Sequence, residues 1–341
     1  MKKYILAAVM TAACGISGFG QADENPNRLI LHYLNGETVT FDLGELDYME
    51  FDREDPVPPA PADPKIGDYF YSDGTWSDGG LISIDADGCN AVWSTTRPAP
   101  IEGKTVVGIV FQTDPERMSE ADREAGFTHG YVIGCRNITD PGKSNYASYP
   151  ESVWFAGQWA TTDINSVAKA ASTCYQRING SEETKKMIDG NDPKYYDEDI
   201  PLFYYGTEKY PVAAPEGTSG WFIPAIGQMW DCVANFCSGE VAAFLASNRE
   251  NTADFTYYVS KTDLSHSPAE DFMKIFELVP DSDKDEISIP DSNNILSLGT
   301  SSRYDTESRV IINLGMNGNG LVEGMAEWFD GEAHARPILA F

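Results

Sequence analysis

The sequence predicts an α+β fold built on antiparallel sheet. Strand-like runs of aromatic and aliphatic residues come in neighbouring groups, separated by loops rich in Gly, Asp and Asn. Helical stretches are few and do not alternate regularly with the strands, as they would in a doubly wound parallel sheet. Hydrophobic residues make up 42% of the 341 residues and aromatic residues 12%, which suffices for a packed core and excludes a wholly disordered chain.

The charge balance excludes several classes of partner. Lys and Arg number 24 against 53 Asp and Glu, for a formal net charge of −29 and a pI near 4.3. Such a chain repels phosphate backbones and anionic lipid headgroups, so we expect no nucleic-acid partner. The four histidines are scattered, and the paired-histidine motifs of zinc hydrolases are absent.

The first 22 residues have the pattern of a secretory signal peptide. Two lysines precede an apolar run from Tyr4 to Ala13, and small residues lead to a cleavage position after Ala22. No later segment approaches the roughly 20 apolar residues that span a membrane. We therefore expect export to the cell surface or the extracellular space, with the periplasm or outer membrane as alternatives. In a second interpretation the chain is a lipoprotein acylated at Cys14, although Thr11 stands where such signals usually carry a bulky aliphatic residue.

Two short segments precede the main domain. Between Arg28 and Phe51, strand-like runs flank Asn35-Gly36, the pair that most strongly indicates a hairpin turn. Residues 23–55 are therefore predicted to form a small β module, too short for independent stability. Residues 56–64 are Pro-rich and favour an extended linker, which leaves residues 65–341 as the main domain.

The main domain is predicted to contain an antiparallel sheet and two main helices. The expected helices are an Ala-rich stretch from Ile164 to Arg177 and an apolar-periodic stretch from Ile226 onward, with Pro224 near its first turn. The expected strands are Tyr69 to Tyr71, Leu81 to Ile84, Val106 to Phe111, Tyr131 to Ile133, Thr256 to Val259, Ile275 to Leu278, Val310 to Leu314 and Pro337 to Ala340. No repeat of 20–50 residues is visible, which disfavours solenoids and propellers.

Four segments carry a resemblance to a known family. They are Lys65–Ser77, Val106–Phe111, Trp221–Trp230 and the closing Ala335–Phe341. Together they resemble secreted surface proteins of Gram-negative gut anaerobes that carry a Fibrobacter succinogenes major paralogous domain or another C-type-lectin-like domain. The resemblance covers about residues 65–341 and implies a C-type-lectin-like fold there. The leading module resembles a short segment that often follows the signal peptide in such proteins.

Catalytic motifs are not apparent. The chain has no G-x-S-x-G, no Walker loop and no G-x-G-x-x-G that opens a helix. Cys135 and His129 are too far apart along an extended strand to act as a pair. After loss of the leader five cysteines remain, and the sequence leaves open whether they form disulfides or are buried thiols. We expect no cofactor.

An acidic stretch has the start of a calcium-loop spacing. Asp281, Asp283 and Asp285 occupy alternate positions, but Glu286 replaces the glycine of the sharp turn and Ser292 replaces the bidentate glutamate. A solvated acidic loop is the better interpretation, and no metal site is predicted.

The segment before the last strand combines amides, carboxylates and an indole. Asn317, Asn319, Glu327, Trp328 and Asp330 are the candidate ligand-binding residues, because planar amides and carboxylates bind sugar hydroxyls and an aromatic face covers the apolar side of a sugar ring. The resemblance points to the same loops as a binding face. The alternative is that Asn-Gly-Asn-Gly is a hairpin turn and that Trp328 belongs to the core.

Together these observations predict an exported, non-enzymatic surface or secreted protein. It would bind an extracellular glycan or protein ligand in the manner of an adhesin, through the loops before the final strand. One alternative is an extracellular enzyme related to sulfatase-modifying proteins. Another is a structural, fimbria-like surface subunit, in which the hairpin of residues 28–51 pairs with the edge of a partner.

Overall fold

The computed structural model divides into two compact units, Met1–Pro59 and Ala60–Phe341. The division falls inside the Pro-rich segment. The structure describes residues 28–32, 38–42, 63–84, 91–139, 153–154, 169–237, 239–253, 257–287, 294–304, 308–328 and 332–341. The predicted signal peptide, Cys14 and most of the Pro-rich segment lie outside these residues.

The first unit contains a β-hairpin. Strand β1 (Arg28–His32) pairs antiparallel with β2 (Thr38–Asp42), and His32 lies opposite Thr38. The pairing predicted for this module is therefore confirmed. The Asn35-Gly36 turn and the run from Tyr48 to Phe51 lie outside the described residues.

A five-stranded antiparallel sheet joins the beginning and the end of the second unit. Its order is β15-β8-β7-β3-β4. Its strands are β3 (Tyr69–Tyr71), β4 (Trp76–Ser77), β7 (Val106–Gln112), β8 (Tyr131–Gly134) and β15 (Ile338–Ala340). Every residue of β7 and β8 is buried, because separate apolar clusters cover the two faces. This is why both strands read as continuous apolar runs in the sequence.

A second, four-stranded sheet has the order β10-β13-β12-β11, also antiparallel throughout. Its strands are β10 (Tyr257–Lys261), β11 (Ile295–Arg303), β12 (Ser308–Gly315) and β13 (Val322–Trp328). In the connection between β12 and β13, the Asn319 N–H donates to the Met316 carbonyl over 3.1 Å. Asn317 and Gly318 both have positive φ, at 55° and 82°. This is a type I′ turn, for which Asn-Gly is the favoured pair.

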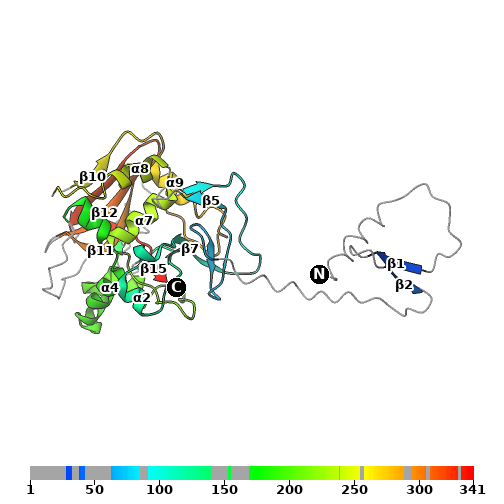
Figure 1. Ribbon diagram of the computed structural model, residues 1–341. Coiled ribbons are helices and arrows are strands. Elements are labelled where there is room, and N and C mark those ends of the chain that lie inside the picture. The colour runs from blue at the N-terminus through cyan, green and yellow to red at the C-terminus, as the bar shows by residue number, and fades with distance from the viewer. Residues whose placement is uncertain are drawn as a thin grey trace. The chain divides into compact units, whose positions relative to one another are not determined.

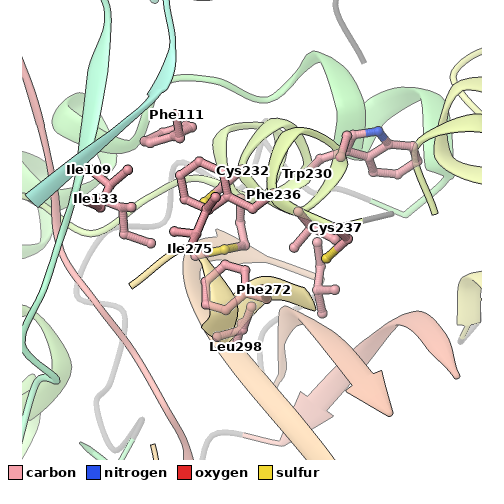
Figure 2. Packing of buried hydrophobic residues seen from close by; sticks show 14 of the residues in the cluster. Ile109, Phe111, Ile133, Trp230, Cys232, Phe236, Cys237, Phe272, Ile275 and Leu298 are labelled. Carbon is pink, nitrogen blue, oxygen red and sulfur yellow. The ribbon is translucent and has the colours of Figure 1, made fainter. Parts of the chain in front are cut away.

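Helix α7 (Ile226–Phe236) lies between the two sheets and is buried along its whole length. It contacts β7 of the first sheet and β11 and β12 of the second (Figure 1). Figure 2 shows Cys232 and Phe236 of α7 close to Phe111 and, on the other side, Phe272. The helix predicted from Ile226 onward is confirmed, and its apolar sequence follows from having a sheet on either side.

Shorter elements complete the fold. The helices are η2 (Pro115–Arg117), α2 (Glu120–Glu124), α3 (Ala171–Gln176), α4 (Gly180–Asp189), η3 (Pro193–Tyr195), α5 (Tyr196–Asp199), α6 (Pro201–Gly206), α8 (Gly239–Ser247) and α9 (Pro268–Lys274). The small strands are β5 (Leu81–Ile84), β6 (Ala91–Trp93), β9 (Val153–Trp154) and β14 (Glu332–Ala333), of which β5 pairs with β6 and β9 with β14. Among the described residues, no helix is long and apolar enough to cross a membrane.

The α+β class with antiparallel sheets is confirmed, but the expectation of two main helices is wrong. Helices α4, α8 and α9 are additional, and each is too short for helical periodicity to stand out in the sequence. Of the helix predicted over Ile164–Arg177, the described part forms α3 alone.

The strand predicted over Ile275–Leu278 is also wrong. This segment is the turn that follows α9, since the N–H groups of Phe276 and Glu277 donate to the carbonyls of Met273 and Lys274. Ile275 and Phe276 are buried because a helical turn places them on the core side, and a short apolar run of this kind does not distinguish strand from helix.

Candidate functional site

The predicted amide pair lies in the turn between β12 and β13, where its side chains support the turn. The Asn317 amide donates to Oδ1 of Asn294 over 2.8 Å, and the Asn319 amide donates to the Asn294 carbonyl over 3.4 Å. The Gly318 N–H donates to the Ser267 hydroxyl at the start of α9. These amides tie the turn to its neighbours, as in the hairpin-turn interpretation of the sequence.

The other predicted site residues lie at the opposite end of β13. Glu327 pairs with Arg309 and Trp328 with Ser308, at the far end of the hairpin from the turn. The seven residues of β13 separate the two groups by about 20 Å at the rise of an extended strand. Asp330 lies outside the described residues. The structure therefore does not gather the four described residues into one site, because a strand extends where a compact loop was expected.

A cleft between β6 and α9 has a volume of about 610 Å³. One wall is the segment from Ala91 to Arg97, and the other is the end of α9 with the turn from Lys274 to Leu278. Phe236 and Cys237, at the end of α7, are buried in its floor. A cleft of this size falls in the usual range for small-ligand sites.

Trp93 supplies an indole to the wall of the cleft, and its surroundings hold it in place. It ends β6, opposite Leu81 of β5, and is half-buried. The edge of its indole packs against Gly67, where an added Cβ would lie 2.2 Å from the ring. Gly67 also has a φ of +86°, so glycine is required there for both space and backbone conformation. The guanidinium of Arg97 lies 5.5 Å from the ring centre, within cation–π range.

Arg97 joins the two walls of the cleft. Its Nε donates to the Gly79 carbonyl over 2.9 Å, and its Nη1 and Nη2 donate to the carbonyls of Lys274 and Ile275 over 3.2 Å each. The last carbonyls of a helix have no partner within the helix, and a cation is favoured at that end. Arg97 therefore fixes the end of α9 relative to Trp93.

Besides the apolar Ala91, Ile275 and Leu278, the cleft is lined by hydroxyl-bearing and charged residues. The Ser94 hydroxyl donates to the Thr96 carbonyl over 2.9 Å, which shapes the loop after β6. Asp271, Lys274 and Glu277 line the opposite wall. A fixed indole with hydroxyls and carboxylates around it can stack on the apolar face of a sugar ring and hydrogen-bond to its hydroxyl groups.

The described cysteines have the properties of core residues. Cys135, Cys174, Cys232 and Cys237 are free thiols and all are buried. Burial raises the pKa of Cys135 to about 12 and also raises the pKa values of the other three. A buried thiol with a raised pKa is a poor nucleophile at neutral pH. The buried-thiol interpretation holds for these four, and Cys89 lies outside the described residues.

The acidic stretch after α9 binds protein groups. The Val106 N–H donates to the carboxylate of Asp283. Asp285 pairs with Arg136 over 2.8 Å and accepts from the Asn137 N–H over 3.0 Å. The expectation of a solvated loop holds for Asp281, which is exposed, but not for Asp283 and Asp285, whose carboxylates hold the loop against the first sheet. In the described ranges, no group of three or more His, Cys, Asp or Glu residues could hold a metal ion.

Sequence reasoning missed the Trp93 cleft. The available signal was the run from Trp93 to Arg97, an indole followed by three hydroxyl residues and a cation. Such a run is common in loops, and its partner wall lies about half the chain away in sequence. Trp221 and Trp230, by contrast, are buried in the core.

Comparisons with known proteins give no family for this chain. No family model matches it, and no curated protein matches it. Among solved structures it is similar to a fimbrial protein from Bacteroides ovatus ATCC 8483, with 16% identity and a TM-score of 0.42 over 92% of this chain. The match spans 57% of that fimbrial protein. A likeness of this degree does not define a shared fold.

Proposed function

We propose that this chain is an exported surface or secreted binding protein without catalytic activity, and that the Trp93 cleft holds a glycan ligand. The observation that carries the proposal is the fixed indole in a cleft of about 610 Å³ that is bordered by hydroxyls and carboxylates. Because Trp93 is already held in place by Gly67 and Arg97, stacking a sugar ring on it costs little ordering. The cleft replaces the loops before the final strand as the proposed binding site.

The proposed cellular localisation and the proposed fold rest on the sequence. The leader pattern of residues 1–22 supports export. The C-type-lectin-like fold is supported by where the four segments that resemble the family lie in the structure. Three of them contribute β3, β7 and β15 to one sheet, and the fourth contains Phe222, which bridges to Ile338 of β15. The fourth segment also begins α7, which packs on the same sheet.

Four cysteines argue against the enzyme alternative. An enzyme related to sulfatase-modifying proteins needs a reactive cysteine, and the four described cysteines are buried thiols with raised pKa values, while Cys89 lies outside the described residues. The fimbria-like alternative keeps one supporting observation, which is that β1 and β2 form a two-stranded sheet in the described part of the first unit. Such a sheet is marginal alone, and deletion of residues 23–55 would abolish self-association if that hairpin joins subunits.

The test is binding of purified residues 23–341 to a glycan and mucin array, in calcium and again in chelator. We expect saturable binding to a sugar class that Trp93→Ala weakens at least tenfold. Tyr195→Ala is the matched control, because Tyr195 is an exposed aromatic residue away from the cleft. Trp328→Ala tests the segment predicted from the sequence. Binding that survives Trp93→Ala would refute the cleft, and loss with Trp328→Ala alone would place the site at the end of β13.

A further inference from the structure

The α9 wall of the Trp93 cleft is a single stripe on a helical surface. The chain keeps its helical path beyond the end of α9, because Ile275 has helical φ and ψ values and the Glu277 N–H donates to the Lys274 carbonyl. Four residues that line the cleft stand at the spacing i, i+3, i+4 and i+7, which places their side chains on one face of this path. They are Asp271, Lys274, Ile275 and Leu278.

This stripe is charged at one end and apolar at the other. Its first two residues, Asp271 and Lys274, are an acid and a base about one helical turn apart. Its last two residues, Ile275 and Leu278, are apolar. Leu278 is 38% exposed, so its side chain is open to a ligand in the cleft. An apolar group of a ligand gains affinity when it leaves water for such a surface.

The charged end of the stripe lies close to the floor of the cleft. Burial raises the pKa of the Cys237 thiol, and the negative charge of Asp271 raises it further, which places this half-buried carboxylate near a floor residue. An ionised carboxylate accepts hydrogen bonds at both oxygens, and a lysine ammonium group donates up to three. The charged end can therefore bind a ligand group that both donates and accepts hydrogen bonds.

The charges that line the cleft favour a neutral ligand. The two acids, Asp271 and Glu277, are matched in number by two bases, Arg97 and Lys274. Arg97 already donates three hydrogen bonds to protein carbonyls. The chain as a whole carries a formal net charge of −29, which repels acidic sugars.

We propose that the Trp93 cleft prefers 2-acetamido sugars to their parent hexoses, with the acetamido methyl group at the apolar end of the stripe and the amide at its charged end. Such a sugar replaces one hydroxyl by an N–H donor, a carbonyl acceptor and a methyl group, and it stays neutral. The amide and the methyl group adjoin on the ligand, as the charged and apolar ends adjoin on the stripe. The inference rests on the proposed function, since the sugar ring still stacks on Trp93.

Sugars that differ only at carbon 2 isolate the contribution of the acetamido group. One set is the methyl glycosides of glucose, glucosamine and N-acetylglucosamine, and the other set is the corresponding galactose series. Burial of one methyl group is worth about fourfold in affinity, and a hydrogen bond to an ionised group adds to it. The acetamido sugar of at least one set should therefore bind about tenfold more tightly than its parent hexose.

The experiment titrates residues 23–341 with each sugar and measures Kd by NMR, with saturation transfer to identify the sugar protons that touch the protein. The acetamido methyl protons should be saturated. Leu278→Ala should weaken the acetamido sugar about fourfold and leave the parent hexose unchanged, which also shows that the variant is folded. Ile101→Ala is the matched control, because Ile101 is exposed and does not line the cleft.

A second pair of variants tests the charged end. Asp271→Asn keeps the size of the side chain and removes its charge, so the preference for the acetamido sugar should decrease. Asp263→Asn is the matched control, because the Asp263 side chain is 84% exposed and does not line the cleft. That variant should keep the preference unchanged.

Several outcomes would overturn the inference. They are equal affinities for the acetamido sugar and its parent hexose in both sets, tightest binding of a hexosamine, and no binding of either acetamido sugar. Equal weakening of both sugars by Leu278→Ala would overturn the placement of the methyl group. The proposed function survives these outcomes if another glycan on the array binds and Trp93→Ala weakens it. Acetamido binding that Trp93→Ala leaves unchanged would instead count against the cleft itself.

Discussion

Replacing Arg97 by methionine tests how the Trp93 cleft is held together. The substitution removes three donated hydrogen bonds, to the carbonyls of Gly79, Lys274 and Ile275. It also removes the cation 5.5 Å from the Trp93 ring centre. Methionine keeps an unbranched apolar stem in the same space. A decrease in the free energy of unfolding therefore reflects removal of the guanidinium group and not creation of a cavity.

The expected cost follows from the geometry of these bonds. A hydrogen bond to a charged group contributes about 1.5–3 kcal/mol when buried. Arg97 is half-buried and two of its bonds are 3.2 Å long, so we take about 1 kcal/mol for each, or about 3 kcal/mol in all. At about 2–4 °C per kcal/mol for a domain of this size, Tm should fall by about 6–12 °C.

The assay is urea unfolding followed by tryptophan fluorescence. The matched control is Lys104→Met, because Lys104 also lies over a ring, that of Tyr71, but its ion pair with Asp73 is exposed. That variant should lose less than about 1 kcal/mol. If Arg97→Met loses no more than Lys104→Met, then Arg97 does not join the walls of the cleft, and the reasoning from its three hydrogen bonds is wrong.

Three further predictions concern the core. Phe341→Ala should cost about 3–5 kcal/mol in urea unfolding, because the ring is buried 4.7 Å from that of Phe70; a loss as small as that of the exposed control Leu278→Ala would contradict this. Thiol labelling with mass spectrometry should leave Cys135, Cys174, Cys232 and Cys237 unmodified in folded protein and modify them in urea, whereas rapid native labelling of any of them would revive the enzyme alternative. Burial raises the pKa of the Asp68 carboxyl to about 6 from its usual 3.8. Between pH 4 and 6 the unfolded protein therefore releases this proton more readily than the folded protein, and the free energy of unfolding should fall as the pH rises through this window. If Asp68→Asn shows the same pH profile as the unsubstituted protein, another group is responsible.

The first sheet was the part of the fold most accessible to sequence reasoning. Val106 to Phe111 and Tyr131 to Ile133 are continuous apolar runs because both faces of β7 and β8 are covered. Helix α7 was equally predictable from the sequence, since Pro224 precedes a long run of apolar residues at helical spacing. Strand β11 was missed because Ser, Thr and Gly fill most of its buried positions, where a strand pattern requires apolar residues.

The candidate site was beyond the reach of sequence reasoning for a physical reason. The position of the Trp93 ring depends on Gly67, which packs against the edge of the indole, and on Arg97. The Arg97 guanidinium donates to carbonyls of residues 177 and 178 positions further along the chain. A local pattern contains none of these distant contacts. The segment from Asn317 to Asp330 attracted attention because its residue types suit sugars, but the pairing of β12 with β13 spreads them along the hairpin.

The end of α9 explains why two cavities lie close together in this fold. Its last carbonyls and those of the following turn need donors from elsewhere. Arg97 supplies them to Lys274 and Ile275, while Nζ of Lys284 supplies them to Phe276 and Glu277 over 3.2 and 3.1 Å. One cation lines the Trp93 cleft, the other lines a second cavity of about 210 Å³ beside Phe276, and Glu277 borders both. The turn is thus a shared wall, so loosening it with Arg97→Met should weaken ligand binding in the Trp93 cleft.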